Sequence, residues 1–219
     1  MLFDWQFALE ILPQLARAAV VTIEATLLGF AVAAVLGLVL ALLRRSRNPW
    51  TSAITGGFIE FIRSTPVLIQ IFFLFFVFPR FGIVIPAFAA GVIALGLHYA
   101  CYCSEVNRAG LDGVPRGQWE AATALNLGPL QTYRDVIIPQ AIPPVVPALG
   151  NYLVGMFKET PLLSAIAVLE LMQTAKIIGS ETFRYLEPIT MVGAFFLVMS
   201  LVSAAGVRRV EAWLKSRRG

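Results

Sequence analysis

The sequence predicts an all-α integral membrane protein with about five membrane-spanning helices. Of its 219 residues, 58% are hydrophobic and only 14% are charged, whereas a soluble domain carries about 25% charged residues. The mean hydropathy is +0.78. Five segments are apolar enough to be candidates for crossing a bilayer, which takes about 20 residues per helix. The excess apolar residues are therefore expected to face lipid or to be buried between membrane helices.

The candidate spans follow one another along a single domain, residues 1–219. Residues 1–17 alternate apolar and polar side chains, which is typical of a short external helix at the membrane surface. The five spans are residues 18–43, 65–78, 85–106, 142–157 and 188–207. The second and fourth are the shortest, and prolines interrupt the fourth.

The first span contains small residues at regular spacing. Gly29, Ala33 and Gly37 have four-residue spacing, which lets another helix approach closely. That helix belongs either to the same chain, which we favour, or to a second subunit.

The third span carries the two cysteines of the chain. Cys101 and Cys103 are too close in sequence for a usual disulfide or a CxxC metal pair, so we expect two buried thiols.

The positions of Lys and Arg predict the orientation. Four lie in residues 44–63, three in residues 108–134 and five in residues 208–218, which is 12 of the 17 cations. This bias predicts an external N-terminus and a cytoplasmic C-terminus, and five spans give that parity. The net charge of +4 is therefore mainly a topology signal, and no nucleic-acid partner is expected.

A polar island, GQWEAATALNLGPLQTYRDVIIPQAIPPVVP at residues 117–147, separates the third and fourth spans. Glu120, Ala121 and Ala122 begin a short helix, and Asn126 and Gly128 mark a turn. An isolated helix this short is marginal in water, so it needs its own packing or a partner surface. The alanines allow close approach, and Glu120 can pair with a basic group.

Four blocks resemble permease subunits of ATP-binding-cassette (ABC) importers for polar amino acids, and together they cover most of residues 59–211. They are IEFIRSTPVLIQ at 59–70, LHYACYCSEVNRAGLDGVPRGQWEAA at 97–122, IIPQAIPPVVPALGNYLVGMFKETPLLSAIAVLEL at 137–171 and YLEP at 185–188. The segment 111–140 resembles the family's EAA loop. The resemblance implies a cytoplasmic helix–turn–helix that couples to a separate ATPase through Glu120, Ala121, Ala122, Asn126 and Gly128.

The chain departs from the family pattern at two places. The turn carries Asn126 where the family usually has Gly, and Asn is the non-Gly residue best suited to a left-handed conformation. Many relatives have Lys-Asp-Thr-Ser where this chain has Lys158-Glu159-Thr160-Pro161, which affects the inferred substrate. The details of residues 151–187 are most similar to permease subunits for ectoine and hydroxyectoine, which are compatible solutes.

The resemblance implies an importer assembly in the bacterial cytoplasmic (inner) membrane. This chain would be a multi-pass permease, not an enzyme, and would form the solute pathway with a second permease subunit, identical or homologous. Two ATPase subunits, which bind ATP and Mg, and an extracytoplasmic solute-binding protein complete it. We expect no cofactor in this chain.

Other function classes have less support. No GxxxxGK[ST] phosphate loop, GxSxG elbow or HExxH pair occurs, and there is one histidine. We expect neither a catalytic residue nor a metal site. The alternative is an ion-coupled secondary transporter or channel, and a membrane enzyme ranks third. The EAA block favours the importer, because a secondary carrier needs no ATPase dock.

Polar residues inside the spans are candidates for the substrate pathway, because charge is costly there. Glu159 is the foremost, supported by Thr160, with Lys158 beside it. Both charges can serve instead in a structural ion pair. His98 and Tyr99 on the third span, Asn151 and Tyr152 on the fourth, and Gln70 either line a cavity or bond neighbouring helices. Each of the sequences Thr65-Pro66 and Thr160-Pro161 marks either a break in a span or a simple helix start.

Overall fold

The computed structural model describes residues 3–216, and within that range the chain is helical with short connections. The elements are α1 (Trp5–Arg44), α2 (Pro49–Arg63), α3 (Val67–Phe72), the π-helix η1 (Phe73–Val77), the 3-10 helix η2 (Phe78–Phe81), α4 (Ala87–Asp112), α5 (Arg116–Ala124), α6 (Pro129–Gln131), the π-helix η3 (Thr132–Ile137), α7 (Ile138–Glu159), the 3-10 helix η4 (Thr160–Ile166), α8 (Leu171–Thr182) and α9 (Leu186–Ser216). This confirms the all-α membrane fold class.

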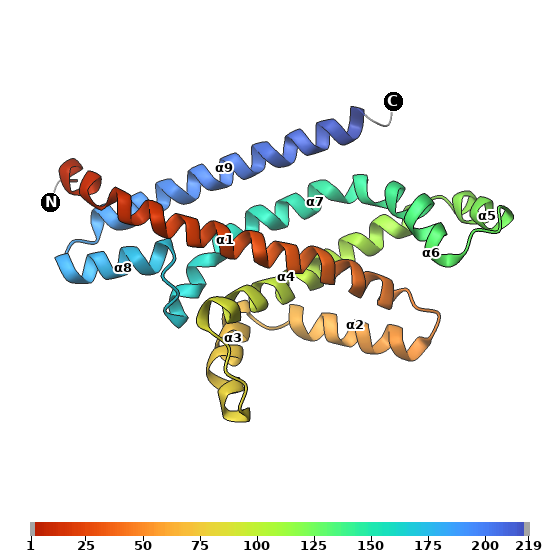
Figure 1. Ribbon diagram of the computed structural model, residues 1–219, viewed down its shortest axis with the longest axis horizontal. Coiled ribbons are helices and arrows are strands. Elements are labelled where there is room, and N and C mark those ends of the chain that lie inside the picture. The colour runs from red at the N-terminus through yellow and green to blue at the C-terminus, as the bar shows by residue number, and fades with distance from the viewer. Residues whose placement is uncertain (1–2, 217–219) are drawn as a thin grey trace.

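The long helices run along the long axis of the molecule (Figure 1). The start of α1 and helix α8 lie at one end, which we call the α8 end. Helices α5 and α6 form the opposite end, the α5 end, and α9 runs toward it. The two ends of the chain therefore lie toward opposite ends of the molecule, as an odd number of crossings requires.

Helix α1 is longer than the sequence indicates. Its 40 residues extend about 60 Å at 1.5 Å per residue, roughly twice the hydrocarbon thickness. The side chain of Asp4 accepts hydrogen bonds from the backbone of Gln6 and Phe7 and caps the helix. The prediction of a separate surface helix in residues 1–17 is wrong, because residues 5–17 are continuous with the first span.

The small residues of α1 pack against α4 within the same chain. A Cβ added to Gly37 would lie 2.6 Å from the Cβ of Cys103, and one added to Gly29 would lie 3.6 Å from the Cβ of Leu95. Larger side chains would separate the two helices. The favoured reading of intrachain packing is confirmed. Cys101 and Cys103 are both buried free thiols, also as expected.

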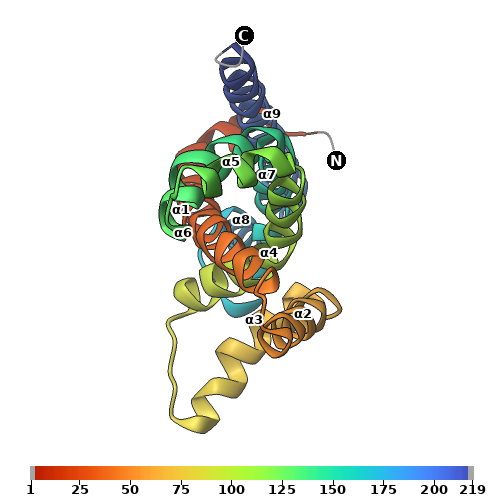
Figure 2. The ribbon, with the colours of Figure 1, turned by 90° about the vertical axis from the view of Figure 1, so that its right-hand side faces the viewer.

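Among the described residues, four helical segments are long and apolar enough to span a membrane, and a fifth crossing arises if a bent pair counts as one span. The pair joins Pro49–Arg63 to Val67–Phe81 with a bend of 100°, and its second arm points away from the body (Figure 2). The expected span at 65–78 therefore covers most of that second arm and leaves out the first. Ser64, Thr65 and Pro66 form the break, since Pro66 has no backbone N–H to continue the helix.

The fourth predicted span, 142–157, is the middle of a continuous helical run, Pro129–Ile166. Pro143, Pro144 and Pro147 lie inside α7 without ending it, so these prolines do not interrupt the span. Membrane helices tolerate proline when local π or 3-10 geometry satisfies the freed backbone groups. Here the π-helix η3 precedes α7, and η4 begins at Thr160, where α-helical geometry ends.

Helix α8 has no counterpart among the predicted elements. The fully buried Glu170 caps it, accepting hydrogen bonds from the backbone of Met172 at 3.0 Å and Gln173 at 2.7 Å. The hydroxyl of Thr22 on α1 accepts a hydrogen bond from the backbone of Leu171. The Glu170 cap begins α8, and the bond to Thr22 fixes that helix start against α1.

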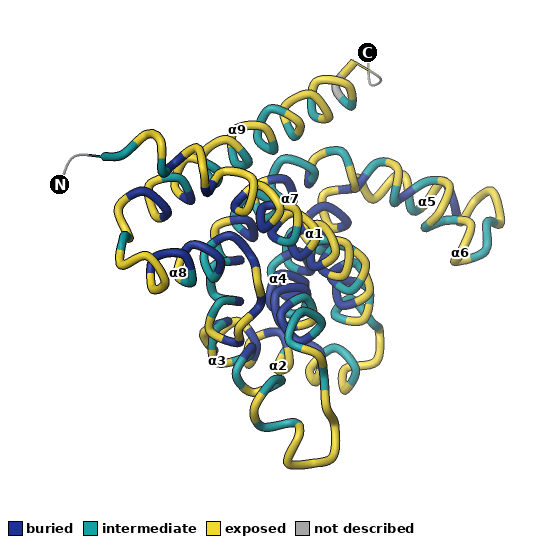
Figure 3. The backbone as a smooth tube through the Cα atoms, turned by 60° about the vertical axis from the view of Figure 1, so that its left-hand side comes forward, coloured by how far each residue is buried: buried dark blue, intermediate teal, exposed yellow. Residues whose placement is uncertain are grey.

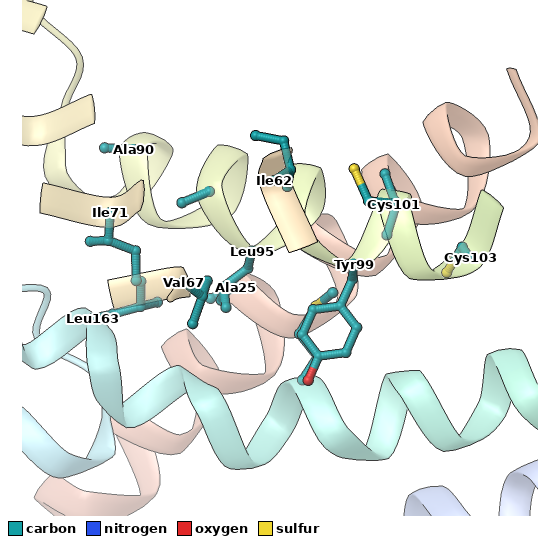
Figure 4. Close-up of a cluster of buried hydrophobic side chains, with 14 of the residues drawn as sticks. Ala25, Ile62, Val67, Ile71, Ala90, Leu95, Tyr99, Cys101, Cys103 and Leu163 are labelled. Carbon is teal, nitrogen blue, oxygen red and sulfur yellow. The ribbon is translucent and has the colours of Figure 1, made fainter. Parts of the chain in front are cut away.

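The helices differ strongly in burial. Helix α4 lies in the centre and is mostly buried, whereas α9 is exposed along most of its length (Figure 3). The main apolar core joins α1, α3, α4, α7 and η4 around Leu95, Tyr99, Met156 and Leu163. In this cluster Tyr99 points from α4 toward α7 (Figure 4). The core therefore surrounds the residues that the sequence singled out on the third span.

Candidate functional site: the loop at the α5 end and a polar cluster between the helices

The predicted loop residues lie on α5 and at the turn that follows it. Glu120 and Ala121 are exposed, whereas Ala122 is buried and faces the rest of the molecule. The short helix therefore packs through one alanine and presents Glu120 and the other alanine outward. A helix–turn–helix with an unpartnered outer face is suited to contact with another protein.

Asn126 forms the turn in the left-handed conformation, with φ of +54°. The backbone N–H of Leu127 donates to the carbonyl of Ala122 at 3.0 Å, which closes the end of α5. The expectation that Asn126 replaces glycine at this turn is confirmed. Gly128 then precedes α6, with Pro129 at its first position.

The tip of this loop is apolar as well as exposed. Leu125 is 73% exposed and Leu130 is 80% exposed. Both lie at the α5 end, which projects beyond the bundle (Figure 1). Two leucines beside an exposed carboxylate are an arrangement that a partner protein can cover.

A second group of polar residues lies between the helices, close to the bend after α2. The amide nitrogen of Gln70 is 2.8 Å from the carbonyl oxygen of Ile62 and 3.2 Å from Nδ1 of His98. Gln70 therefore connects the broken end of α2 to α4. Its other amide atom, Oε1, is buried without a hydrogen-bond partner among the described residues.

Aromatic rings extend this group across α4 and α7. Tyr99 and Tyr102 of α4 each pack against Tyr152 of α7, with centroid distances of 6.1 and 5.8 Å. The guanidinium carbon of Arg63 lies 5.0 Å from the centroid of the Tyr102 ring. A basic group thus sits at one end of a row of tyrosines.

Glu159 lies at the other end of the row. Its carboxylate is close enough to the Tyr99 hydroxyl to interact with it, and its Oε2 is buried without a hydrogen-bond partner. No ion pair joins Glu159 to Lys158 or to another basic residue in the part of the chain that the structure describes. The structural alternative, an ion pair that neutralises Glu159, is therefore not found. An unsatisfied buried carboxylate oxygen can accept a hydrogen bond from a cationic ligand.

Three other predicted pathway residues are not brought into this cluster. Asn151 and Lys158 are exposed on the outside of the chain. Thr160 is fully buried and donates a hydrogen bond from its hydroxyl to the carbonyl of Phe157 at 2.7 Å. The expected support of Glu159 by Thr160 is thus corrected: the Thr160 hydroxyl closes the last turn of α7.

Arg63 and Tyr102 were not among the predicted pathway residues, whereas Tyr152 was a candidate beside Asn151. Arg63 was counted among the cations of residues 44–63, but it ends the first arm of the broken span and stacks on Tyr102. The signal that could have found it is its place immediately before Ser-Thr-Pro, at a helix break. Tyr102 carries no such signal, because a Tyr on a membrane helix is also common at the interface.

Comparison with known proteins gives concordant matches over nearly the whole chain. A family model described as "Binding-protein-dependent transport system inner membrane component" matches residues 33–216. The probable amino-acid ABC transporter permease protein y4tG of Sinorhizobium fredii (strain NBRC 101917 / NGR234) is 49% identical over 211 residues, covering 96% of this chain and 91% of that protein. The probable amino-acid ABC transporter permease protein PatM of Vibrio harveyi is 33% identical over 218 residues, covering 98% and 96%.

Among solved structures, a chain of the crystal structure of an amino acid ABC transporter with histidines matches with a TM-score of 0.87 and 35% identity. The match covers 97% of this chain and 99% of that chain. The similarity thus includes the loop at the α5 end and every helix that contributes to the polar cluster.

Proposed function

This chain belongs to the family of binding-protein-dependent transport system inner membrane components, and from that membership we propose that it forms the solute pathway of an ATP-driven importer for a zwitterionic solute. It is a membrane-embedded permease subunit of an amino-acid ABC transporter. Permeases of this family are not enzymes, and ATP is hydrolysed by a separate ATPase subunit. No observation favours the alternative of an ion-coupled secondary transporter or channel.

The exposed face of α5 is the observation that supports an importer driven by a separate ATPase. Glu120, Ala121, Leu125 and Leu130 are exposed at the end of the bundle, where no other described element covers them. We propose that this face, with the Asn126–Gly128 turn, docks an ATPase. Two ATPase subunits, each with ATP and Mg, would serve this chain and a second permease.

Reversing the charge of Glu120 tests the dock. Glu120→Lys is expected to weaken association with the ATPase about tenfold, since a charge reversed at an interface creates like-charge contacts. Membrane insertion should be unchanged, because the side chain is exposed. The measurement is co-purification and solute-stimulated ATP hydrolysis in proteoliposomes. Glu181→Lys, an equally exposed site on α8, is the matched control. Normal ATPase binding and full uptake in Glu120→Lys would refute the dock.

The polar cluster supports the substrate class. Glu159 offers an unsatisfied carboxylate oxygen, and Arg63 offers a guanidinium at the far end of the tyrosine row. A zwitterion carries an ammonium or amidinium group that can bind the Glu159 carboxylate and a carboxylate that can bind the Arg63 guanidinium. We propose that Gln70, His98 and Tyr99 line the same pathway between them.

The individual solute is a narrower proposal. An amino acid or a related zwitterion such as ectoine could pair with both Glu159 and Arg63, at the two ends of the tyrosine row. The partner that selects the solute would be an extracytoplasmic solute-binding protein. A thermal-shift screen of that protein against amino acids and compatible solutes tests the identity. Stabilisation by amino acids but not by ectoine would remove ectoine from the proposal.

The orientation follows from the cation bias and the placement of the two chain ends. We propose an external N-terminus and a cytoplasmic α5 end in a bacterial inner membrane, with a second permease, identical or homologous, completing the pathway. Single cysteines at Gln14 and Ser216, both exposed, test this in a background without Cys101 and Cys103. An impermeant thiol reagent should label only the first in intact cells. Equal labelling at both sites would contradict the orientation.

A further inference from the structure

The side chain of Arg45 contacts two other elements at the α5 end. Arg45 follows α1 as its C-terminal cap residue. Its Nε lies 2.9 Å from Oδ1 of Asp112, the last residue of α4. Its guanidinium carbon lies 5.4 Å from the centroid of the Trp119 ring, on α5. One side chain thus joins the ends of α1 and α4 to the short helix that carries Glu120.

An arginine is required for this double contact. A planar guanidinium can stack on an aromatic face while it donates hydrogen bonds to a carboxylate in its own plane. A lysine ammonium is a single point charge and cannot do both from one position. The side chain of Arg45 is only 22% exposed, so water competes less for these contacts than at the open surface.

Asp112 is held from its other side. Arg108 donates from Nη1 to Oδ2 of Asp112 at 3.2 Å, and from Nη2 to Glu105 at 2.7 Å. These pairs keep the Asp112 carboxylate at a fixed place on α4. The position of Arg45 is therefore set by α1 and α4 together, and not by the loop.

Trp119 is fixed on the loop side. Its ring meets Tyr133 of η3 edge-on, with 5.4 Å between centroids, and it packs on the small apolar cluster that includes Leu111 and Ile137. Trp119 also precedes Glu120 directly. A shift of α5 therefore carries Trp119 with it and displaces the ring relative to Arg45.

We propose that Arg45 is a positioning residue that ties the coupling helix α5 to the ends of α1 and α4, so that displacement of α5 by the ATPase moves both spans. This inference rests on the proposed function, because it assumes an ATPase at α5. It assigns to Arg45 no contact with solute or with the ATPase. Loss of the tie should leave docking intact and reduce the coupling between hydrolysis and transport.

The test uses the complete importer in proteoliposomes, with permeases, ATPase and binding protein. Arg45→Gln should bind the ATPase as the native chain does and should still hydrolyse ATP. The amount of solute imported per ATP hydrolysed should fall at least about fivefold, the low end of typical coupling factors between sites. Arg45→Lys should lower the solute imported per ATP almost as much, because a lysine cannot stack on Trp119 and pair with Asp112 at the same time.

Arg47→Gln is the matched control. Arg47 is exposed in the same short loop, so this variant removes the same charge without touching the tie. It should import the native amount of solute per ATP. An equal loss in Arg47→Gln and Arg45→Gln would overturn the proposal, since only the net charge of the loop would then matter.

A second variant removes the contact between Arg45 and Trp119 by changing the residue on α5. Trp119→Leu leaves the Arg45–Asp112 ion pair in place, so it guards against misfolding of Arg45→Gln. It should lower import per ATP as Arg45→Gln does, and the double variant should lose no more than the worse single variant. Additive losses, or native import per ATP in either single variant with the ATPase bound, would overturn the role of Arg45. Failure of the native complex to bind an ATPase would instead refute the proposed function.

Discussion

The charged residues where α1 and α4 end and those in the polar cluster between the helices are arranged in opposite ways. At the ends of α1 and α4, Arg45 pairs with Asp112 at 2.9 Å and Arg108 with Glu105 at 2.7 Å, whereas Glu120 on α5 is exposed. In the cluster, Arg63 stacks on Tyr102 and Glu159 approaches Tyr99. No ion pair of the described residues joins those two charges.

The difference separates two tasks. A charge that is paired inside the chain fixes the relative position of two elements, because breaking the pair leaves an uncompensated partner. A charge left without a counter-charge inside a membrane protein is costly, and is retained where a ligand or hydrated path supplies the partner. The paired charges thus hold the ends of α1 and α4 in place, and the cluster has the unpaired charges that the proposed binding of a charged solute requires.

The largest expected effect is at Glu159. Glu159→Gln keeps the shape of the side chain and removes its charge. If the carboxylate binds the cationic part of the solute, transport should fall about tenfold to a hundredfold, the range for one hydrogen bond to a charged group. ATPase association and basal hydrolysis should be native, since Glu159 is the last residue of α7, at the opposite end of that helix from the loop.

Lys158→Gln is the control for Glu159. The two residues are neighbours, but Lys158 is exposed and outside the cluster. Lys158→Gln should leave the apparent affinity for solute unchanged. Native transport kinetics in a well-folded Glu159→Gln importer would show that Glu159 does not bind solute. The proposed difference in task between the paired and the unpaired charges would then lose its support.

An intermediate effect is expected at Tyr102. Tyr102→Leu removes the ring under Arg63, so the guanidinium loses a cation–π contact and its fixed position. Such a contact contributes about 0.5–2 kcal/mol, so the apparent affinity for solute should fall about twofold to thirtyfold. Tyr102→Phe keeps the ring and should be close to native. If both variants lose affinity equally, the hydroxyl matters and the stacking does not; if both are native, Tyr102 has no role in binding.

The sequence anticipated those features that depend on local chemistry. The helical membrane class follows from composition, and the left-handed turn follows from Asn126 beside Gly128. A break at Thr65-Pro66 was one of the two predicted readings, and the 100° bend at that place confirms it. The predicted span did not include the first arm, Pro49–Arg63, because Glu60 and Arg63 make that segment more polar.

Several residues of the polar cluster were predicted one by one, but which of them come together could not be predicted, because the cluster combines residues from α2, α3, α4 and α7 that are distant in sequence. Lys158 and Glu159 illustrate the limit. Successive residues on a helix point about 100° apart, so only one of them can face the cluster. Which one does is decided by how α7 packs on α4, where Gly155 lies against Tyr99. No local pattern carries that information.

The smallest expected effect concerns a third charged group, at the α8 end, which resembles the α5 end in being paired. Arg184 lies 3.1 Å from Asp4 and 2.8 Å from Glu187. The hydrogen bond from the backbone N–H of Phe7, followed by Arg184, lowers the pKa of Asp4 below its ordinary value of 3.8. The charged form is thus favoured in the folded state. Its contribution is present above pH 3.8 and is lost as the pH falls through the lowered pKa.

Acidification should therefore loosen the start of α1 only below about pH 4, near the ordinary pKa of aspartate. Asp4→Asn should lower the thermal midpoint of the purified permease slightly at neutral pH and should reduce its further fall in acid. The measurement is the thermal midpoint in detergent as a function of pH, taken as the difference between the native chain and the variant. Glu10→Gln, an exposed carboxylate two turns along the same helix, should not change that dependence. If the difference between native chain and Asp4→Asn is constant from neutral to acid pH, Asp4 is not held by its charge. The α8 end would then be maintained by apolar packing, unlike the α5 end.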